Sequence, residues 1–348
     1  MEKPKLKTPP PPEKLFIDLD SIVFKAASAS EQIVYSAVDP DGNVVATFDS
    51  AASYNNWKES IEFLGLDMDF GYEGDLEDLT RETDYQVGKL KDAKKIFDYI
   101  VEEWVEQSGC KEVTGYVSKS SGEENFRYSV ARLKPYKGNR ENTRKPHYLE
   151  DVRKYAASKD WVKIPRGNVE VDDACCAYSQ KAGWKGCVAT VDKDGRGVKN
   201  THVLIPDEMD EPQFSSQKVV GFLWLNEKGK LVGLGDLFWL AQILYGDKAD
   251  NYEGCKGLGE KGAYNLLKDF SGVDAKYLKD ALKVVCETYE KTYGQEYEHY
   301  DHHKETYTVR HWKEILEEMC QLVYMKKSRN DVCPYLQIIE EIYNENNS

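Results

Sequence analysis

The sequence predicts an α/β fold with a mostly parallel sheet, and three observations support this prediction. Short apolar strands alternate with amphipathic helices, a pattern typical of parallel sheets. Several of these strands lead into carboxylates, and parallel sheets bind ligands at the carboxyl ends of their strands. An apolar helix at 237–244 leads into a run of acids and glycines at 246–263. We therefore expect one site that combines carboxylates with a phosphate-binding turn.

The individual elements follow from the apolar periodicity of each segment. Residues 1–14 are rich in proline and lysine and are expected to form a disordered leader. Strands are predicted at 15–18, 113–117, 186–191 and 219–225, and a hairpin at 33–38 and 44–48 around the turn 39–42. Helices are predicted at 89–107, 148–157, 172–181 and 237–244, and mostly helical structure at 275–345. Residues 51–82 are acidic without clear periodicity and are interpreted as an insertion or a peripheral helix.

The composition is that of a globular protein with reduced thiols. The 348 residues are 41% hydrophobic and 31% charged, and no apolar stretch of about 18 residues predicts a membrane span. The N-terminus has no apolar secretory signal. The eight cysteines form no CxxC pair, which favours a cytoplasmic protein over a disulfide framework or a zinc site.

Charge is distributed unevenly along the chain. The net charge is −14, which argues against a general nucleic-acid coat protein. Between Arg127 and Arg166, however, twelve basic and four acidic side chains give a net charge of +8. A basic strip on an acidic protein is suited to local contact with phosphates.

Acidic residues from five separate segments are candidates for a metal site. Each follows a predicted strand or stands at a predicted helix end; they are Asp18, Glu170, Asp172, Asp173, Asp192, Asp194, Asp247 and Asp250. Asp247 and Asp250 are three residues apart, a spacing that places them on one face of a helical turn. Taken alone, each of these acids would be interpreted as a helix cap or as part of a solvated loop. Together they would repel one another unless cations neutralise them, and hard divalent cations prefer oxygen ligands.

The glycine-rich run after the last acids predicts a phosphate cradle. Gly254, Gly257 and Gly259 allow close approach of backbone N–H groups to an anion, and a helix N-terminus with Lys261 follows. Such a turn alone is often only a joint between two helices. Joined to the acids, it indicates a metal-dependent enzyme that acts on nucleic acid.

A second basic element lies at 127–140. Lys137 and Arg140 are candidates to hold a scissile phosphate, and Tyr136 offers a ring for an unpaired base. Arg127 belongs to the same element. Without the acids, a solvated basic loop would be the preferred interpretation.

Five motifs in order resemble the 5′-3′ exonuclease and flap endonuclease family, especially its bacteriophage members. They cover roughly residues 14–270 and are Phe16–Asp18, Tyr136–Arg140, Glu170–Asp173, Asp192–Asp194 and Gly246–Ala263. The resemblance implies a doubly wound α/β domain at 15–235 and a helix-hairpin-helix element with a helical region at 236–348.

The resemblance also implies roles for individual residues. Two Mg²⁺ or Mn²⁺ ions would be held, the first by Asp18, Glu170 and Asp172, the second by Asp192, Asp194, Asp247 and Asp250 with Asp173 nearby. Gly254–Gly262 would grip duplex DNA and often a K⁺ ion, with Gly257, Gly259 and Lys261 among its contacts. Lys137 and Arg140 would lie at the foot of an arch, for which residues 141–168 are short. Arg127 and Tyr136 would contact DNA, and Lys25 would contact a phosphate.

The implied activity is hydrolysis of DNA from a 5′ end or at a 5′ flap, in phage replication or recombination within a bacterial host's cytoplasm. Paired divalent ions about 3.5–4 Å apart activate water and stabilise the leaving oxygen. One departure weakens the first metal site: residues 115–122 contain no acid after the second strand. Asp20, Glu123 and Glu124 are the candidates to compensate.

The sequence is also consistent with other interpretations. One is a DNA-binding homologue of the same fold with weakened catalysis, and another is an RNA-directed metal-dependent nuclease. The helices expected at 273–289 and 312–324 either pack against the core or dock a replication protein.

Overall fold

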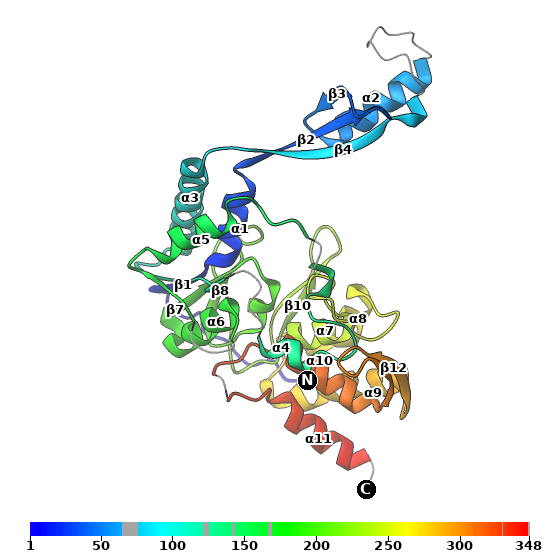
Figure 1. The fold of residues 1–348 in the computed structure, drawn as a ribbon. Helices are drawn as coiled ribbons and strands as arrows, with labels where there is room; N and C mark the ends of the chain where they lie inside the picture. Colours follow the sequence, from blue (N-terminus) through cyan, green and yellow to red (C-terminus); the bar gives the residue numbers. More distant parts are fainter. Residues whose placement is uncertain (65–75, 121–124, 141–142, 166–168, 329, 347–348) are drawn as a thin grey trace. The chain divides into compact units, whose positions relative to one another are not determined.

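The computed structural model describes residues 1–64, 76–120, 125–140, 143–165, 169–328 and 330–346 (Figure 1). The chain forms two compact units. Unit 1 comprises Met1–Ile22, Ile100–Arg144 and Ala156–Ser348, and unit 2 comprises Val23–Tyr99 and Lys145–Tyr155. The predicted domain boundary at residue 235 therefore falls inside unit 1.

Unit 1 is built on a six-stranded sheet with the order β6-β5-β1-β7-β8-β9. Its strands are β1 Lys14–Asp18, β5 Glu112–Tyr116, β6 Val162–Lys163, β7 Gly186–Ala189, β8 Thr201–Leu204 and β9 Gln213–Ser215. All neighbours pair in parallel except β8 and β9, which are antiparallel. The α/β prediction with a mostly parallel sheet is confirmed. All four residues of β7 are buried, as expected for a central parallel strand.

Helices connect these strands, and α6 packs against β1 and β7. The helices in this part of the chain are α1 Leu19–Ser28, α3 Leu90–Ser108, α4 Phe126–Val130, α5 Leu149–Ala157 and α6 Val171–Ala182. The helices predicted at 89–107, 148–157 and 172–181 are confirmed within one or two residues. Short 3₁₀ helices lie at Gly138–Arg140 (η2), Gly183–Lys185 (η3), Lys193–Gly197 (η4), Lys268–Phe270 (η5) and Ala275–Tyr277 (η6).

A hairpin and two helices follow the main sheet. The antiparallel pair β10 Gly221–Leu225 and β11 Leu231–Gly235 leads into α7 Asp236–Tyr245, and α8 Glu260–Leu267 packs against α7. Every residue of α7 before Tyr245 is buried. A helix that is apolar along most of its surface belongs in a core. The loop 246–259 between α7 and α8 contains the run of acids and glycines.

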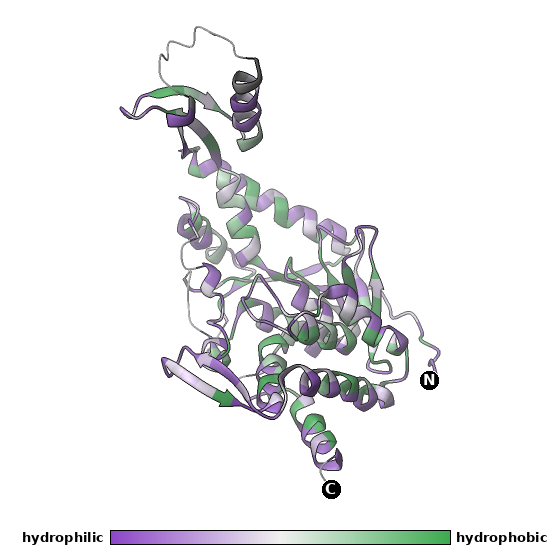
Figure 2. Cartoon of the chain, turned by 90° about the vertical axis from the view of Figure 1, so that its right-hand side faces the viewer, coloured by the Kyte–Doolittle hydropathy of each residue, from purple (hydrophilic) through white to green (hydrophobic). Residues whose placement is uncertain are grey.

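The C-terminal part of unit 1 contains more than the predicted helices. These helices are α9 Leu278–Tyr293, α10 Trp312–Val323 and α11 Tyr335–Asn346. Between α9 and α10, β12 Tyr297–Asp301 and β13 Thr306–Arg310 form an antiparallel hairpin that the helical interpretation of 275–345 missed. Figure 2 shows that apolar residues concentrate on parts of each helix, while polar residues cover the rest. In the described part of the chain, no helix is both long and apolar enough to cross a membrane.

Unit 2 contains a three-stranded antiparallel sheet with the order β3-β2-β4. Its elements are β2 Glu31–Val38, β3 Val44–Phe48, α2 Ala51–Leu64, η1 Leu76–Asp78 and β4 Thr80–Val87. The predicted hairpin is confirmed, and the segment interpreted as an insertion supplies α2, η1 and the first residues of β4. Within that segment, 65–75 lie outside the described residues. Tyr54 and Leu79 pack with Ala37, Phe48 and Trp57 into a small core.

The N-terminal residues before β1 form neither helix nor strand. Two acids of this segment nevertheless contact the rest of unit 1. Glu2 pairs with Lys276 at 2.7 Å, and Glu13 pairs with Lys185 at 3.2 Å.

Candidate metal centre

The carboxyl ends of β1 and β7 bring the first acids together. Asp18 is the last residue of β1, and Asp192 follows β7, its parallel neighbour. Thr190 connects the two, because its hydroxyl donates to Asp18 Oδ2 at 3.1 Å and accepts from the Asp192 main-chain N–H at 3.0 Å. The parallel pairing therefore fixes the positions of these acids, as the sequence predicted.

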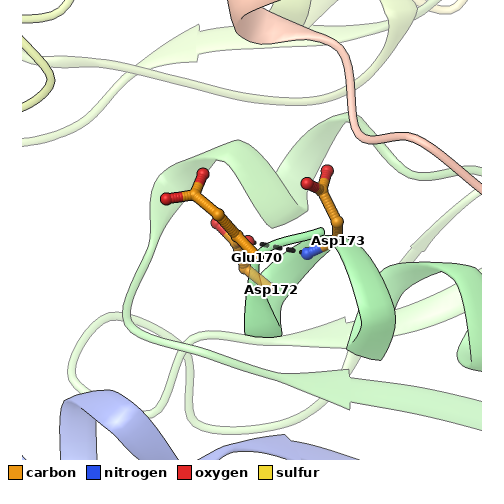
Figure 3. Close-up of side chains that lie close together, drawn as sticks. All are labelled: Glu170, Asp172 and Asp173. Carbon is orange, nitrogen blue, oxygen red and sulfur yellow. Dashed lines mark hydrogen bonds between the residues drawn. The ribbon is translucent and has the colours of Figure 1, made fainter. Parts of the chain in front are cut away.

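The start of α6 contributes the first compact group of acids, Glu170, Asp172 and Asp173 (Figure 3). One carboxylate oxygen of each lies within 4.8 Å of the others. Glu170 is the N-cap residue but caps no N–H group with its side chain, whereas the Asp173 main-chain N–H donates to Asp172 Oδ1 at 2.7 Å. Burial and the neighbouring Glu170 raise the pKa of Asp172 well above its usual range. Burial acts on Glu170 in the same direction, but Arg127 and Lys137 outweigh it and lower its pKa.

Asp192, Asp194 and Asp250 form the second group, again with one oxygen each within 4.8 Å. Asp192 caps η4 by accepting the Asp194 main-chain N–H at 2.9 Å. Asp194 is 2% exposed and accepts a hydrogen bond from Gln242 of α7. Burial raises the pKa of Asp250 to about 6, and burial with Asp192 raises that of Asp194 well above its usual range.

The prediction that Asp247 and Asp250 share one face of a helical turn is wrong. Gly246 caps α7 with φ 79°, and the chain then folds into a loop closed by an antiparallel bridge between Asp247 and Tyr252. Asp247 pairs with Lys193 at 3.0 Å instead of joining Asp192 and Asp194 directly. Since Gln242 donates to both Asp194 and Asp247, at 3.3 Å to the latter, Asp247 remains linked to the second group.

The basic segment 134–140 lies directly on this acidic loop. The Lys137 main-chain N–H donates to the Asp250 carbonyl at 3.0 Å, and Asn139 donates to the Lys248 carbonyl at 2.7 Å. Asn251 in turn donates to the Pro135 carbonyl at 2.8 Å. These contacts explain why two segments more than a hundred residues apart share one site.

Three side chains of this segment contact the two groups of acids. Lys137 Nζ lies 2.6 Å from Glu170 Oε1 and 3.9 Å from Asp250 Oδ1, and Arg140 lies 2.9 Å from Asp250. The Tyr136 hydroxyl lies 3.0 Å from Glu170 Oε2 and 2.8 Å from Asp250 Oδ2. Tyr136 is 3% exposed, so its ring offers no free face to a base in this structure.

Two other predicted contact residues lie elsewhere. Arg127 is 1% exposed, and its guanidinium contacts Glu170 and Asp173 rather than the surface. Lys25 lies half-buried in the last turn of α1 and belongs to unit 2, so its role as a phosphate contact stays a prediction.

Asp20 contacts the chain that follows β5, the segment in which the sequence supplies no acid. After β5 the chain reaches Ser118, whose main-chain N–H and hydroxyl donate to Asp20 Oδ1 at 3.1 and 3.0 Å. The Asp20 main-chain N–H donates to Asp18 Oδ1 at 3.0 Å. Burial and the Asp20 charge raise the pKa of Asp18 to about 7. The other two candidates, Glu123 and Glu124, lie outside the described residues.

The glycine-rich loop has a buried side and an exposed side. A Cβ atom at Gly254 would meet the Leu244 carbonyl oxygen at 2.2 Å, so this glycine allows close packing against α7. Gly257, with φ 78°, and Gly259 have open space in the Cβ direction. Both are exposed, as is Lys261 in the first turn of α8. The exposed side therefore leaves room for a ligand at the start of α8.

The donor set fits hard divalent cations. The two groups consist of carboxylate oxygens, the ligands that Mg²⁺ and Mn²⁺ prefer. Burial raises the pKa values of Asp18 and Asp250, and repulsion from the neighbouring carboxylates Asp20 and Asp192 adds to this effect. Lys137, Arg140 and Lys193 compensate only part of this negative charge.

Comparison with known proteins gives structural similarity alone. No family model matches the chain, and no curated protein matches it. A solved structure of the T5 D15 protein crystallised with metal ions aligns with 96% of this chain and 97% of its own, at 13% identity and a TM-score of 0.43.

Two further solved structures concern proteins of the same kind. T5 5′-exonuclease with bound zinc ions aligns with 72% of this chain and 90% of its own, at 16% identity and a TM-score of 0.38. The bacteriophage T5 D15 flap endonuclease in a pseudo-enzyme–product complex with DNA and metal ions aligns with 73% and 91%, at 15% identity and a TM-score of 0.38. Both structures carry the names of activities found in the family that the motifs resemble.

Proposed function

We propose that this chain is a divalent-metal-dependent nuclease that hydrolyses phosphodiester bonds of DNA from a 5′ end. One observation carries the proposal: the Tyr136 hydroxyl joins two groups of carboxylates from separate segments, and Lys137 and Arg140 of the same basic segment contact them. Carboxylates bind hard cations, and basic side chains beside them bind phosphate. The combination suits phosphodiester hydrolysis better than either half alone.

The acids divide into two proposed metal sites. Asp18, Glu170 and Asp172 would hold the first ion, and Asp192, Asp194, Asp247 and Asp250 would hold the second. When bound, a pair of divalent ions supplies an activated water and stabilises charge on the leaving oxygen. We further propose that Asp20 provides the carboxylate that the chain lacks after β5, since Ser118 holds it beside Asp18.

The chain's own residues have distinct tasks in this proposal. Lys137 and Arg140 bind the phosphate that is cut, and Gln242 orients Asp194 and Asp247. Lys25 contacts a neighbouring phosphate. The exposed turn at Gly257 and Gly259 with Lys261 serves as a helix-hairpin-helix grip on duplex phosphates, and the loop binds K⁺. The substrate is then DNA with a 5′ end or a 5′ flap.

The proposal is tested by titrating Mg²⁺ or Mn²⁺ into cleavage reactions with a 5′-labelled duplex and a 5′-flap substrate. We expect metal-dependent release of short 5′ products, which EDTA abolishes. The Asp194→Asn variant controls for contaminating nucleases. Metal-dependent DNA binding without cleavage would favour the catalytically weakened homologue, and cleavage confined to an RNA version of the same substrates would favour an RNA-directed nuclease.

A further inference from the structure

Arg127 and Asp173 form an ion pair that is enclosed by the protein. Arg127 is 1% exposed and Asp173 is fully buried. Arg127 Nη1 lies 2.8 Å from Asp173 Oδ2, and Nη2 lies 3.0 Å from Oδ1. A bidentate pair of this geometry fixes the orientation of both side chains.

The other donors of Arg127 reach Glu170 and the chain around the end of α10. Nη1 also donates to Glu170 Oε2 at 2.7 Å. Nε donates to the Leu322 carbonyl at 2.9 Å, and Nη2 donates to the Tyr324 carbonyl at 3.2 Å. A guanidinium has five N–H groups, and these contacts use all five. Arg127 therefore joins the first group of acids to a segment almost two hundred residues away.

Asp173 is saturated in the same way. Besides the two contacts from Arg127, its Oδ1 accepts the main-chain N–H of Lys326 at 3.0 Å. Its two oxygens thus hold three N–H donors in a fully buried position. Glu170 and Asp172, the other members of the group, are only half-buried.

We infer that Asp173 is not a metal ligand but the anchor of Arg127, and that Arg127 positions Glu170 by clamping the start of α6 to the segment Leu322–Lys326. The inference rests on the proposed function, because it takes Glu170 to be a metal ligand. It makes the C-terminal region, which carries no recognised motif, a structural part of the site.

The charge balance of this cluster makes the inference testable. Without Asp173, Glu170 would be the only carboxylate paired with the buried Arg127 guanidinium. Arg127 would then compete with a metal ion for the Glu170 carboxylate. Without Arg127, Asp173 would remain as an uncompensated buried charge that repels Glu170. Removing both charges together would restore the balance. The two positions should therefore be strongly non-additive, as residues of one network are.

The experiment is a double-mutant cycle of Arg127→Gln, Asp173→Asn and the double variant. It measures the Mn²⁺ dissociation constant by calorimetry without DNA, the thermal midpoint, and the single-turnover cleavage rate at saturating Mn²⁺. We expect each single variant to raise the Mn²⁺ dissociation constant about tenfold, as loss of a residue that orients a ligand does. The double variant should lose no more Mn²⁺ affinity than either single variant, because the same clamp is lost in all three and the double variant carries no unbalanced charge.

A matched control separates positioning from mere stabilisation. Asp236 is 6% exposed and accepts hydrogen bonds from Tyr335 at 2.8 Å and from Lys199, which ties α11 to α7. Asp236→Asn should lower the thermal midpoint and leave Mn²⁺ affinity unchanged. If the Arg127 and Asp173 single variants behave like this control, Arg127 does not position Glu170. If the losses of the two single variants multiply in the double variant, to about a hundredfold, the two residues act independently and Asp173 is a ligand after all.

Two further measurements keep the result unambiguous. Should a single variant fail to fold, Arg127→Lys keeps the buried charge and loses the planar fork, and we expect it to raise the Mn²⁺ dissociation constant about threefold. Failure of the proposed function would look different. In that case the wild-type protein binds no Mn²⁺, or Asp194→Asn binds it as tightly as wild type does.

Discussion

Lys137 is the residue at which the two groups of carboxylates and the basic segment meet. Its backbone has φ 54°, in the left-handed region that costs a residue with a side chain about 1–2 kcal/mol. Such a conformation persists where surrounding contacts determine it, and here the Asp250 carbonyl and the Glu170 carboxylate do so. Burial lowers the pKa of Lys137, but the charges of Glu170 and Asp250 raise it by more than burial lowers it, so the amine stays charged. The geometry keeps a cation ready beside the proposed metal ligands.

Lys137→Ala and Arg140→Ala should each slow single-turnover cleavage by about two orders of magnitude, in the range observed for loss of a group that stabilises transition-state charge. Duplex binding should weaken only about threefold, because one phosphate contact among many contributes little. Lys185→Ala, which removes an exposed amine paired with Glu13, is the control. If both variants lose duplex affinity but keep the wild-type rate of single-turnover cleavage, the two residues only help to bind DNA and do not act at the phosphate that is cut.

Asp194→Asn should nearly abolish cleavage and leave the fold intact. Asp194 is buried among Asp192, Asp247 and Asp250, so loss of its charge relieves repulsion in the metal-free protein and should not lower the thermal midpoint. DNA binding should be unchanged or tighter. Cleavage assays, thermal denaturation and DNA titration check these three expectations, and wild-type turnover would contradict the assignment of two metal sites.

Asp20→Asn tests whether Asp20 substitutes for the acid that β5 lacks. We expect a rise of about tenfold in the Mn²⁺ dissociation constant, because a carboxylate near the first ion is lost. The pKa of Asp18 should fall, since the Asp20 charge is one cause of its elevation. Calorimetry and a carboxylate titration by infrared spectroscopy measure the two effects. The exposed Asp210→Asn is the control, and identical behaviour of both variants would remove Asp20 from the site.

Residues whose surroundings are set by the local order of strands could be placed from the sequence. Asp18, Asp192 and Asp194 follow neighbouring parallel strands, so their proximity could be predicted from strand position alone. Arg127 could not be placed in this way. Its partners Leu322 and Tyr324 are distant in the sequence, and nothing in the sequence near Arg127 indicates that a later segment encloses it.

At the scale of elements, long periodic segments were predictable and short ones were not. β6 has two residues and β9 has three, too few for an alternation to be detected. The hairpin β12–β13 lies between two helices, and its strands of five residues each are too short to stand out from the surrounding helical pattern. The loop 246–259 shows a similar limit. Its composition predicted a site, but its bridged shape depends on the Gly246 cap, which ends α7 before the acids.

The exposed side of this loop makes Gly259→Val a sharp test of the duplex grip. A side chain at Gly259 meets no protein atom within 4 Å, so the fold should keep its thermal midpoint. A phosphate approaching the start of α8 would meet the valine instead. We expect weaker duplex binding with a flatter salt dependence, and largely retained activity on short single strands.

Binding over a salt series with duplex and single-stranded oligonucleotides measures this effect. Gly254→Val is the contrasting variant, because its side chain would meet the Leu244 carbonyl and should lower stability without selecting between substrates. If Gly259→Val weakens both substrates alike, the loop is not a duplex grip.

At the scale of the whole molecule, net charge conceals a strong segregation. The sequence from 29 to 88 contains fourteen acids and two bases, a net charge of −12 within a chain of −14. Outside this range the acidic and basic side chains therefore nearly balance. The negative net charge of the chain does not cancel the local positive charge of the basic strip at 127–166. The acids of the proposed metal centre are few by comparison. Their influence on stability comes from burial rather than from number.

That burial predicts an unusual pH dependence for the metal-free protein. Burial, first of all, raises the pKa of Asp18 to about 7 and that of Asp250 to about 6, from unfolded values near 3.8. Between these limits the folded state binds more protons than the unfolded state, so the free energy of unfolding falls as pH rises. Glu170 has the opposite sign, but its lowered pKa matters only below its usual value of 4.5.

We therefore expect the metal-free protein to lose stability as pH rises from about 4.5 to about 7. Each pKa unit corresponds to about 1.4 kcal/mol, so the loss should be readily measurable by urea denaturation in EDTA. Mg²⁺ or Mn²⁺ should restore stability at pH 7.5 and have little effect at pH 5, where protons occupy the carboxylates that the ions need. Asp194→Asn should flatten the profile. A metal-free protein whose stability rises steadily over this range would show that the acids are not held together as a repulsive buried group.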